Sequence, residues 1–126
     1  MSEVPEQFLY TKDHEWIAIA EDGTATVGIT DYAQESLGDI TFVEFPDVDT
    51  AFSEGETFGV VESVKAASDL FMPVAGTVIE INDAVDTEPE LLNQSPYTQG
   101  WLLKLRLDPS VDKSQLLSAQ DYQKIL

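Results

Sequence analysis

Lys65 is the residue whose type and surroundings most suggest covalent chemistry. It is the only lysine or arginine between Lys12 and Lys104, in a chain of 126 residues with a formal net charge of -18. Two apolar runs, residues 57–63 and 67–72, meet beside it without the Gly, Pro or Asn of a typical tight turn. An isolated lysine in a turn is most often a solvated, inert residue. A lone amine on a hairpin tip is nevertheless what an acylating enzyme needs if it is to modify one lysine.

The side chains around Lys65 suit recognition by such an enzyme. Ser63 and Ala66 are small and leave room for an enzyme to approach the amine. Val64 is an apolar residue that a partner pocket could read. The predicted recognition residues are Glu62, Ser63, Val64 and Ala66, with Asp69 as a further flanking charge.

The rest of the chain offers few catalytic side chains. It has no cysteine and one histidine, His14, so a transition-metal site would rest on one imidazole and carboxylates. No serine stands in a Gly-x-Ser-x-Gly context, and the glycines form neither a phosphate loop nor a dinucleotide fingerprint. We interpret His14 as structural or as part of a docking surface. A covalent carrier needs few catalytic groups, and any sulfur redox chemistry here must come from a cofactor.

Charge and composition limit the partners. With 24 acidic and 6 basic residues, binding to nucleic acid or to an anionic membrane is unfavourable, because phosphate neutralisation needs Lys and Arg. The acidity favours a soluble monomer and partners with positive clefts, and adaptation to a salty cytoplasm is an alternative explanation. The apolar runs are too short to span a membrane, and no signal or transit peptide is recognisable. A cytoplasmic location is therefore expected.

Hydrophobic periodicity predicts one domain, residues 1–126, made of many short strands and a few small helices. This fold class is mainly β, with mostly antiparallel strands, and α+β by arrangement. Residues 83–100 are predicted to be a long surface connection. The predicted strands cover residues 15–20, 24–29, 40–45, 57–63, 67–72, 77–82 and 101–107.

Capping signals predict where the helices lie. Thr30 is placed to cap a helix over residues 31–37, and Gly38 is placed to end it. In the tail, residues 108–117 have Asp and Pro at a helix start, and residues 118–126 open on a capping-box pattern. The predicted shared face of the last helix comprises Tyr122, Ile125 and Leu126.

A longer segment around Lys65 carries a more specific signal. Residues 58–82, FGVVESVKAASDLFMPVAGTVIEIN, closely resemble the lipoyl-lysine segment of the glycine cleavage system H-protein family, whose hallmark is the Glu-Ser-Val-Lys-Ala core. Departures at Phe71-Met72 and Ala75 affect the hairpin base and leave the attachment lysine alone. The resemblance extends over essentially the whole chain, through residues 14–16, 28–33, 37–40, 43–46, 92–97 and 100–101.

This resemblance implies a fold and a cofactor. The fold would be a lipoyl-type flattened barrel, or sandwich, of two antiparallel sheets with extra N-terminal strands and short C-terminal helices. The lipoyl-like core would cover about residues 24–107 and the helical tail about residues 108–126. Lys65 would carry lipoate in amide linkage.

The resemblance also implies a carrier that is not itself an enzyme. A pyridoxal-phosphate glycine decarboxylase would load an aminomethyl group, and a tetrahydrofolate-dependent aminomethyltransferase would take it. Dihydrolipoyl dehydrogenase, which uses FAD and NAD, would reoxidise the dithiol, and a lipoylating enzyme would attach the cofactor. Some relatives also hand lipoyl groups to other complexes. The loaded arm would dock near Glu15, Ile29 and Asp69, where the Glu15 carboxylate would hold the amine by a charge-assisted hydrogen bond.

Three alternatives remain open from the sequence. Biotinyl domains usually place Met on both sides of the lysine, where this chain has Val64 and Ala66. Lipoyl domains of 2-oxoacid dehydrogenases usually have Asp before the lysine and are shorter modules joined by linkers. An unmodified acidic inhibitor or adaptor is the alternative from another class. The intact mass distinguishes the lipoyl, biotinyl and unmodified forms.

Overall fold

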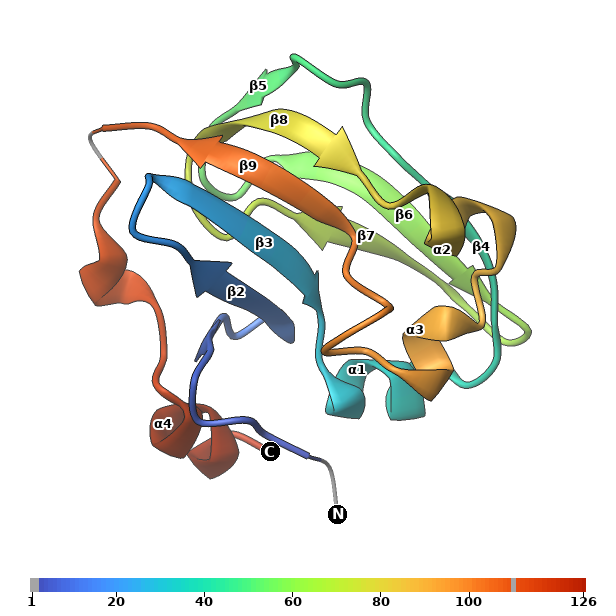
Figure 1. The fold of residues 1–126 in the computed structure, drawn as a ribbon. Coiled ribbons are helices and arrows are strands. Elements are labelled where there is room, and N and C mark those ends of the chain that lie inside the picture. The colour runs from blue at the N-terminus through green and yellow to red at the C-terminus, as the bar shows by residue number, and fades with distance from the viewer. Residues whose placement is uncertain (1–2, 110) are drawn as a thin grey trace.

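The computed structural model describes residues 3–109 and 111–126, which form a sandwich of two antiparallel sheets (Figure 1). The larger sheet has the strand order β1-β2-β3-β9-β8-β5, and the smaller has the order β4-β6-β7. The strands are β1 (Leu9–Tyr10), β2 (Glu15–Ile19), β3 (Thr24–Ile29), β4 (Ile40–Glu44), β5 (Ala51–Phe52), β6 (Thr57–Ser63), β7 (Ala67–Phe71), β8 (Gly76–Ile81) and β9 (Leu103–Leu107). The predicted two-sheet, mainly β architecture is confirmed, and no strand pairing joins the two sheets into a closed barrel within the described ranges.

Short helices lie at the ends of the sandwich. They are α1 (Asp31–Leu37), α2 (Asp83–Thr87), α3 (Leu91–Gln94), the 3-10 helix η1 (Lys113–Gln115) and α4 (Ala119–Lys124). The predicted caps of α1 are confirmed, because Thr30 Oγ1 accepts a hydrogen bond from the Ala33 N–H at 3.2 Å and Gly38 ends the helix with φ of 78°. Within the part of the chain that the structure describes, no helix is long and apolar enough to cross a membrane.

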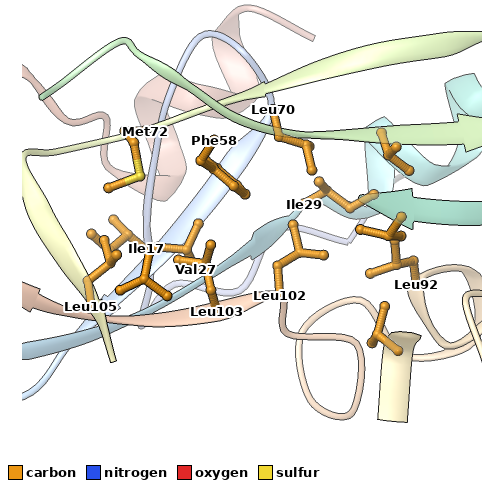
Figure 2. Packing of buried hydrophobic residues seen from close by; sticks show 14 of the residues in the cluster. Ile17, Val27, Ile29, Phe58, Leu70, Met72, Leu92, Leu102, Leu103 and Leu105 are labelled. Carbon is orange, nitrogen blue, oxygen red and sulfur yellow. The ribbon is translucent and has the colours of Figure 1, made fainter. Parts of the chain in front are cut away.

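The main core fills the space between the sheets (Figure 2). Successive side chains of a strand point to opposite faces, so each sheet turns part of its side chains toward this space. Ile17, Val27 and Leu105 come from the larger sheet, and Phe58 and Leu70 come from the smaller sheet. The hairpin that carries Lys65 is therefore anchored by buried residues of both its strands.

A second cluster covers the outer face of the larger sheet at β2. It is built from Tyr10, Trp16, Ala119 and Tyr122, with Phe8 and Trp101 packed against it. The indole of Trp16 lies directly on Gly28, where any Cβ would stand 2.6 Å from the ring. In Figure 1 this corner brings α4 beside the N-terminal segment. The tail is thus part of the packed structure, because it shields an aromatic patch from water.

The predicted tail helices are partly wrong. In place of a helix over residues 108–117 the structure has η1, and residue 110 lies outside the described residues. Leu117 exchanges two main-chain hydrogen bonds with Tyr10, of 2.8 and 2.7 Å, so this stretch is extended along β1. Ser118 does cap α4 by accepting from the Asp121 N–H at 3.1 Å. Ile125 and Leu126 are 50% and 43% exposed and share no buried face with Tyr122.

Two other predicted stretches also differ from the structure. Residues 83–100 contain α2 and α3, which bury Val85 and Leu92, so they are more than a surface connection. Strand β9 begins at Leu103, two residues later than predicted. Leu102, which precedes the strand, is fully buried, and its N–H donates to Val27 O at 2.7 Å.

The Tyr122 hydroxyl joins the tail to the sandwich. It lies 2.8 Å from His14 Nδ1 and 2.7 Å from Thr30 Oγ1, and both Tyr122 and Thr30 are fully buried. Burial raises the pKa of Tyr122 to about 12, so the hydroxyl stays protonated and can donate to one neighbour while accepting from the other. His14 sits in a strained backbone conformation with φ of 67°. The interpretation of His14 as structural fits this network.

Tyr122→Phe is expected to lower the free energy of unfolding by about 1–3 kcal/mol, because it removes the buried hydroxyl that joins His14 and Thr30. Tyr32→Phe is the matched control, since Tyr32 packs against His14 through its ring and its hydroxyl has no hydrogen bond within the described ranges. The control should change stability by less than about 0.5 kcal/mol. Urea unfolding of both variants measures the difference, and equal stabilities would contradict the role of the hydroxyl.

Candidate functional site

The β6–β7 hairpin turns at Val64 and Lys65, as the sequence predicted, and projects at the right of Figure 1. The Ser63 hydroxyl organises this turn. It accepts hydrogen bonds from the N–H groups of Lys65 at 3.3 Å and Ala66 at 3.1 Å, and it donates to Ala66 O at 3.2 Å. The Ser63 N–H also donates to Ala66 O, at 2.8 Å. This side-chain bonding explains how the chain reverses here without Gly, Pro or Asn.

Lys65 is exposed and its amine is unpaired. The two ion pairs within the described residues are Lys104–Glu80 and Lys124–Asp121, so no carboxylate holds the Lys65 ammonium. Its stem passes over Gly38, where an added Cβ would lie 3.6 Å from Lys65 Cε. Residues 64–69 are all exposed. The amine is therefore reachable from solvent while the strands beneath it are fixed.

The neighbours predicted to be read by an enzyme have different surroundings. Val64 is 68% exposed, and its N–H donates to Asp39 O at 3.0 Å, which ties the tip to the start of β4. Glu62 and Ala66 are also exposed, whereas Ser63 is half-buried by its role in the turn. A partner can therefore touch Glu62, Val64 and Ala66 directly.

Val64→Ala is expected to leave the melting temperature nearly unchanged and to impair recognition by any enzyme that acylates Lys65. An exposed side chain contributes less than about 0.5 kcal/mol to stability, and the same substitution leaves the main-chain bond to Asp39 in place. Val61→Ala is the control on the same hairpin, because Val61 is 1% exposed and its loss should cost about 2 kcal/mol. A sharp fall in melting temperature for Val64→Ala, with modification intact, would mean that the tip is packed against the body.

Glu15 is a buried carboxyl at the interface of the two sheets. It is 2% exposed, its Oε2 accepts from the Phe71 N–H at 2.7 Å, and its Oε1 lies 3.5 Å from Thr11 Oγ1. Burial raises the pKa of Glu15 to about 8, and the hydrogen bond from Phe71 opposes part of that rise. The nearby Asp13 charge acts in the same direction as burial. At neutral pH this carboxyl is therefore mainly protonated.

The three residues predicted to dock the arm are only partly brought together. Glu15 and Ile29 are directly opposite each other in the β2–β3 pair, and both are buried. Asp69 is exposed on β7, two residues before the Phe71 N–H that Glu15 binds. Glu15 on β2 thus contacts β7 two residues away from Asp69, and no hydrogen bond joins Glu15 to Asp69 among the described residues.

A cavity of about 380 Å³ opens beside Glu15. Both apolar and polar residues line it, a combination that can hold a ligand with an apolar body and one polar group. Its apolar walls are Met72, Pro73, Leu116 and Leu117, and its polar lining includes Thr11, Lys12, Asp13, Glu15, Glu54 and Gln115. Sequence reasoning missed this cavity because its wall includes the segment mistaken for a helix.

Sequence reasoning also missed the groups that hold Glu15 in place. Phe71 contributes a main-chain N–H, which no side-chain pattern reveals. Tyr122 binds His14 and Thr30, which directly precede Glu15 and follow Ile29 in the chain. These contacts join residues 108 and 92 positions apart, so no local pattern could indicate them.

Comparison with known proteins decides the family. The family model described as glycine cleavage H-protein matches residues 8–126. The chain belongs to the glycine cleavage H-protein family. It is 56% identical over 126 residues to the glycine cleavage system H protein of Opitutus terrae, covering 100% of this chain and 99% of that protein. It is 48% identical over 126 residues to the one of Carboxydothermus hydrogenoformans, covering 100% and 96%.

A solved member of the H-protein family has the same fold. The crystal structure of the glycine cleavage system H protein from Mycobacterium marinum superposes with a TM-score of 0.89 at 42% identity. The match covers 98% of this chain and 100% of the other. The whole sandwich, including the hairpin and the tail, is therefore the fold of this family.

Proposed function

We propose that this chain carries a lipoyl group in amide linkage on Lys65 and shuttles the aminomethyl group of glycine within the glycine cleavage system. The observation that carries the proposal is the free, exposed amine of Lys65 at a fixed hairpin tip, in a member of the glycine cleavage H-protein family. The lipoyl group supplies a dithiolane, whose sulfur chemistry a cysteine-free chain lacks.

The residues around Lys65 fit this attachment. The Ser63 hydroxyl fixes the turn, so the amine leaves the hairpin in a defined direction. Gly38 leaves room for the lysine stem, and Ala66 and Ala67 keep the surroundings small. The unpaired amine needs no ion pair to be broken before it is acylated.

The carrier would serve four enzymes in turn. Glycine decarboxylase, with pyridoxal phosphate, loads the aminomethyl group, and the tetrahydrofolate-dependent aminomethyltransferase removes it. Dihydrolipoyl dehydrogenase, with FAD and NAD, restores the oxidised form, and a lipoylating enzyme installs the cofactor. The net charge of -18 supports a monomeric carrier that meets partners with positive clefts, and the cytoplasm is the proposed location.

The surroundings of Glu15 support a resting place for the loaded arm. Strand β7 leads from Ala67, beside the hairpin tip, to Phe71, beside Glu15. Its length over these four steps is about 13 Å, because each β residue rises by about 3.3 Å. At that end the Glu15 carboxyl holds a proton and the adjacent cavity has apolar walls. A cationic amine near Glu15 would favour the ionised carboxylate and would be held by a charge-assisted hydrogen bond.

Reconstitution with a glycine decarboxylase tests the function. The lipoylated chain is expected to support glycine-dependent release of carbon dioxide, and the unmodified chain is expected to support none above background. The two samples differ only in the modification, which makes the unmodified chain the matched control. Equal activity of both forms would contradict the carrier function.

Loading by the decarboxylase is expected to weaken with salt. Raising the ionic strength from about 0.05 to about 0.5 M shortens the Debye length to a few ångströms and should lower kcat/KM about three- to tenfold, mainly through the association rate. The physical reason is the net charge of -18 together with the exposed Glu62 and Asp69 near the tip. Initial rates well below saturation measure the effect, and a salt-independent rate would mean that the acidity serves solubility or halotolerance alone.

A further inference from the structure

β7 has an open edge immediately after Lys65. In the smaller sheet it pairs with β6 alone. The turn decides which groups face the open side, because the Ser63 N–H donates to Ala66 O and makes these two residues a hydrogen-bonded pair. Antiparallel pairs alternate between hydrogen-bonded and non-hydrogen-bonded, so the main-chain groups of Ala67 and Asp69 point away from β6.

These outward groups lack partners in the part of the chain that the structure describes. The Ala67 N–H and C=O and the Asp69 N–H make no hydrogen bond there. Asp69 O lies 3.5 Å from Ser68 Oγ, at the limit of a hydrogen bond. The next outward N–H, that of Phe71, is bound by Glu15 Oε2 at 2.7 Å. Glu15 therefore occupies the edge of β7 at Phe71, and the edge remains open at residues 67–69.

Two other edges of the sandwich, those of β1 and β4, are at least partly covered. The edge of β1 is sealed by the two main-chain bonds between Tyr10 and Leu117. The first N–H of β4 donates to Asn93 Oδ1 at 2.9 Å, and α2 packs beside that strand. An open edge is usually blunted by being short and by carrying a charge, and Asp69 protects this one against self-association. The same features leave it accessible to a basic partner.

We infer that the enzyme that acylates Lys65 docks by adding an extended segment with basic side chains to the edge of β7 at residues 67–69. The inference rests on the proposed function, because it requires Lys65 to be the acylated residue. Main-chain hydrogen bonds to the outward groups of Ala67 and Asp69 provide the register. A basic side chain opposite Asp69 adds charge complementarity. Pairing in register sets the position of Lys65 relative to the bound enzyme.

Amide hydrogen exchange of the unmodified chain, with and without the lipoylating enzyme and in the absence of lipoate, tests the pairing. The Ala67 and Asp69 amides are expected to exchange at least about tenfold more slowly in the complex. The Ser68 and Leu70 amides already face β6 and serve as internal controls that should change little. A complex in which Ala67 and Asp69 exchange as fast as in the free chain would overturn the inference.

A pair of variants at one position tests the same bond by kinetics. Ala67→Pro removes the outward N–H without removing a β6–β7 ladder bond, and Ala67→Thr adds bulk while keeping the N–H. Lipoylation kcat/KM is expected to be about five- to tenfold lower for Ala67→Pro than for Ala67→Thr, the range expected for one lost hydrogen bond. Equal values in two folded variants would overturn the inference. If Ala67→Pro melts early, the exchange measurement on the unsubstituted chain decides.

Failure of this inference is distinguishable from failure of the proposed function. If Lys65 is modified at a normal rate in Ala67→Pro, the proposed strand pairing is refuted and the proposed carrier function is unaffected. If Lys65 is never modified in the unsubstituted chain, both the proposed strand pairing and the proposed carrier function are refuted.

Discussion

Lys65→Arg is expected to abolish lipoylation of the chain. A guanidinium keeps the positive charge but stays protonated at neutral pH and is a poor acyl acceptor. Because Lys65 is exposed and unpaired, the substitution should change stability by less than about 0.5 kcal/mol. Mass spectrometry after incubation with the lipoylating enzyme, lipoate and ATP measures the loss.

Lys104→Arg is the matched control for this substitution. Lys104 stands on β9, pairs with Glu80 at 3.6 Å and lies 5.0 Å from the centre of the Trp101 ring. The Lys104→Arg variant should be lipoylated on Lys65 to the same extent as the unsubstituted chain. A lipoyl group that still attaches to the Lys65→Arg variant, at Lys12, Lys104, Lys113 or Lys124, would contradict the attachment site.

Glu15→Gln is expected to remove a large pH dependence of stability. The folded protein holds the Glu15 proton more tightly than the unfolded chain, because burial raises the pKa from 4.5 to about 8. The stabilisation that this group contributes is therefore complete below about pH 4.5 and is lost as the pH rises through 8. The loss amounts to a few kcal/mol.

The Gln variant keeps the shape of the protonated carboxyl and an oxygen that can accept from the Phe71 N–H. Denaturant unfolding at intervals from pH 5 to pH 9 should therefore give the variant a growing advantage over the unsubstituted chain. The chain has 24 acidic residues, and the variant keeps all of them except Glu15. The difference in stability between the two proteins therefore reports on Glu15 alone. Parallel stability curves across this range would contradict the raised pKa.

Local patterns predicted most of the fold, because they reflect local physics. The apolar runs around residues 24–29 and 57–63 became β3 and β6 with the predicted bounds. Thr30 and Gly38 bounded α1 because capping depends on neighbouring residues in the chain. The tail differed because Leu117 pairs with Tyr10, a long-range contact that overrides the helical signal of residues 108–117.

In the candidate site, too, local signals were predictable from the sequence and long-range contacts were not. The Lys65 tip was predictable, since composition, spacing and the Glu-Ser-Val-Lys-Ala core are all local to it. The burial of Glu15 was not, because it depends on a main-chain N–H of Phe71 from the other sheet. The role of Ser63 in the turn was also hidden, since a serine in this position is equally compatible with a residue read by a partner.

The mass of the intact chain purified from its own cells shows whether one lipoyl group is attached to Lys65. We expect the mass to exceed that of the unmodified chain by one lipoyl group, with fragment spectra that place this group on Lys65. Lys12, Lys104, Lys113 and Lys124 should be unmodified in the same spectra. A chain that carries biotin, that is lipoylated on another lysine, or that shows no modification in cells with an active lipoylating enzyme would contradict a lipoyl carrier function through Lys65.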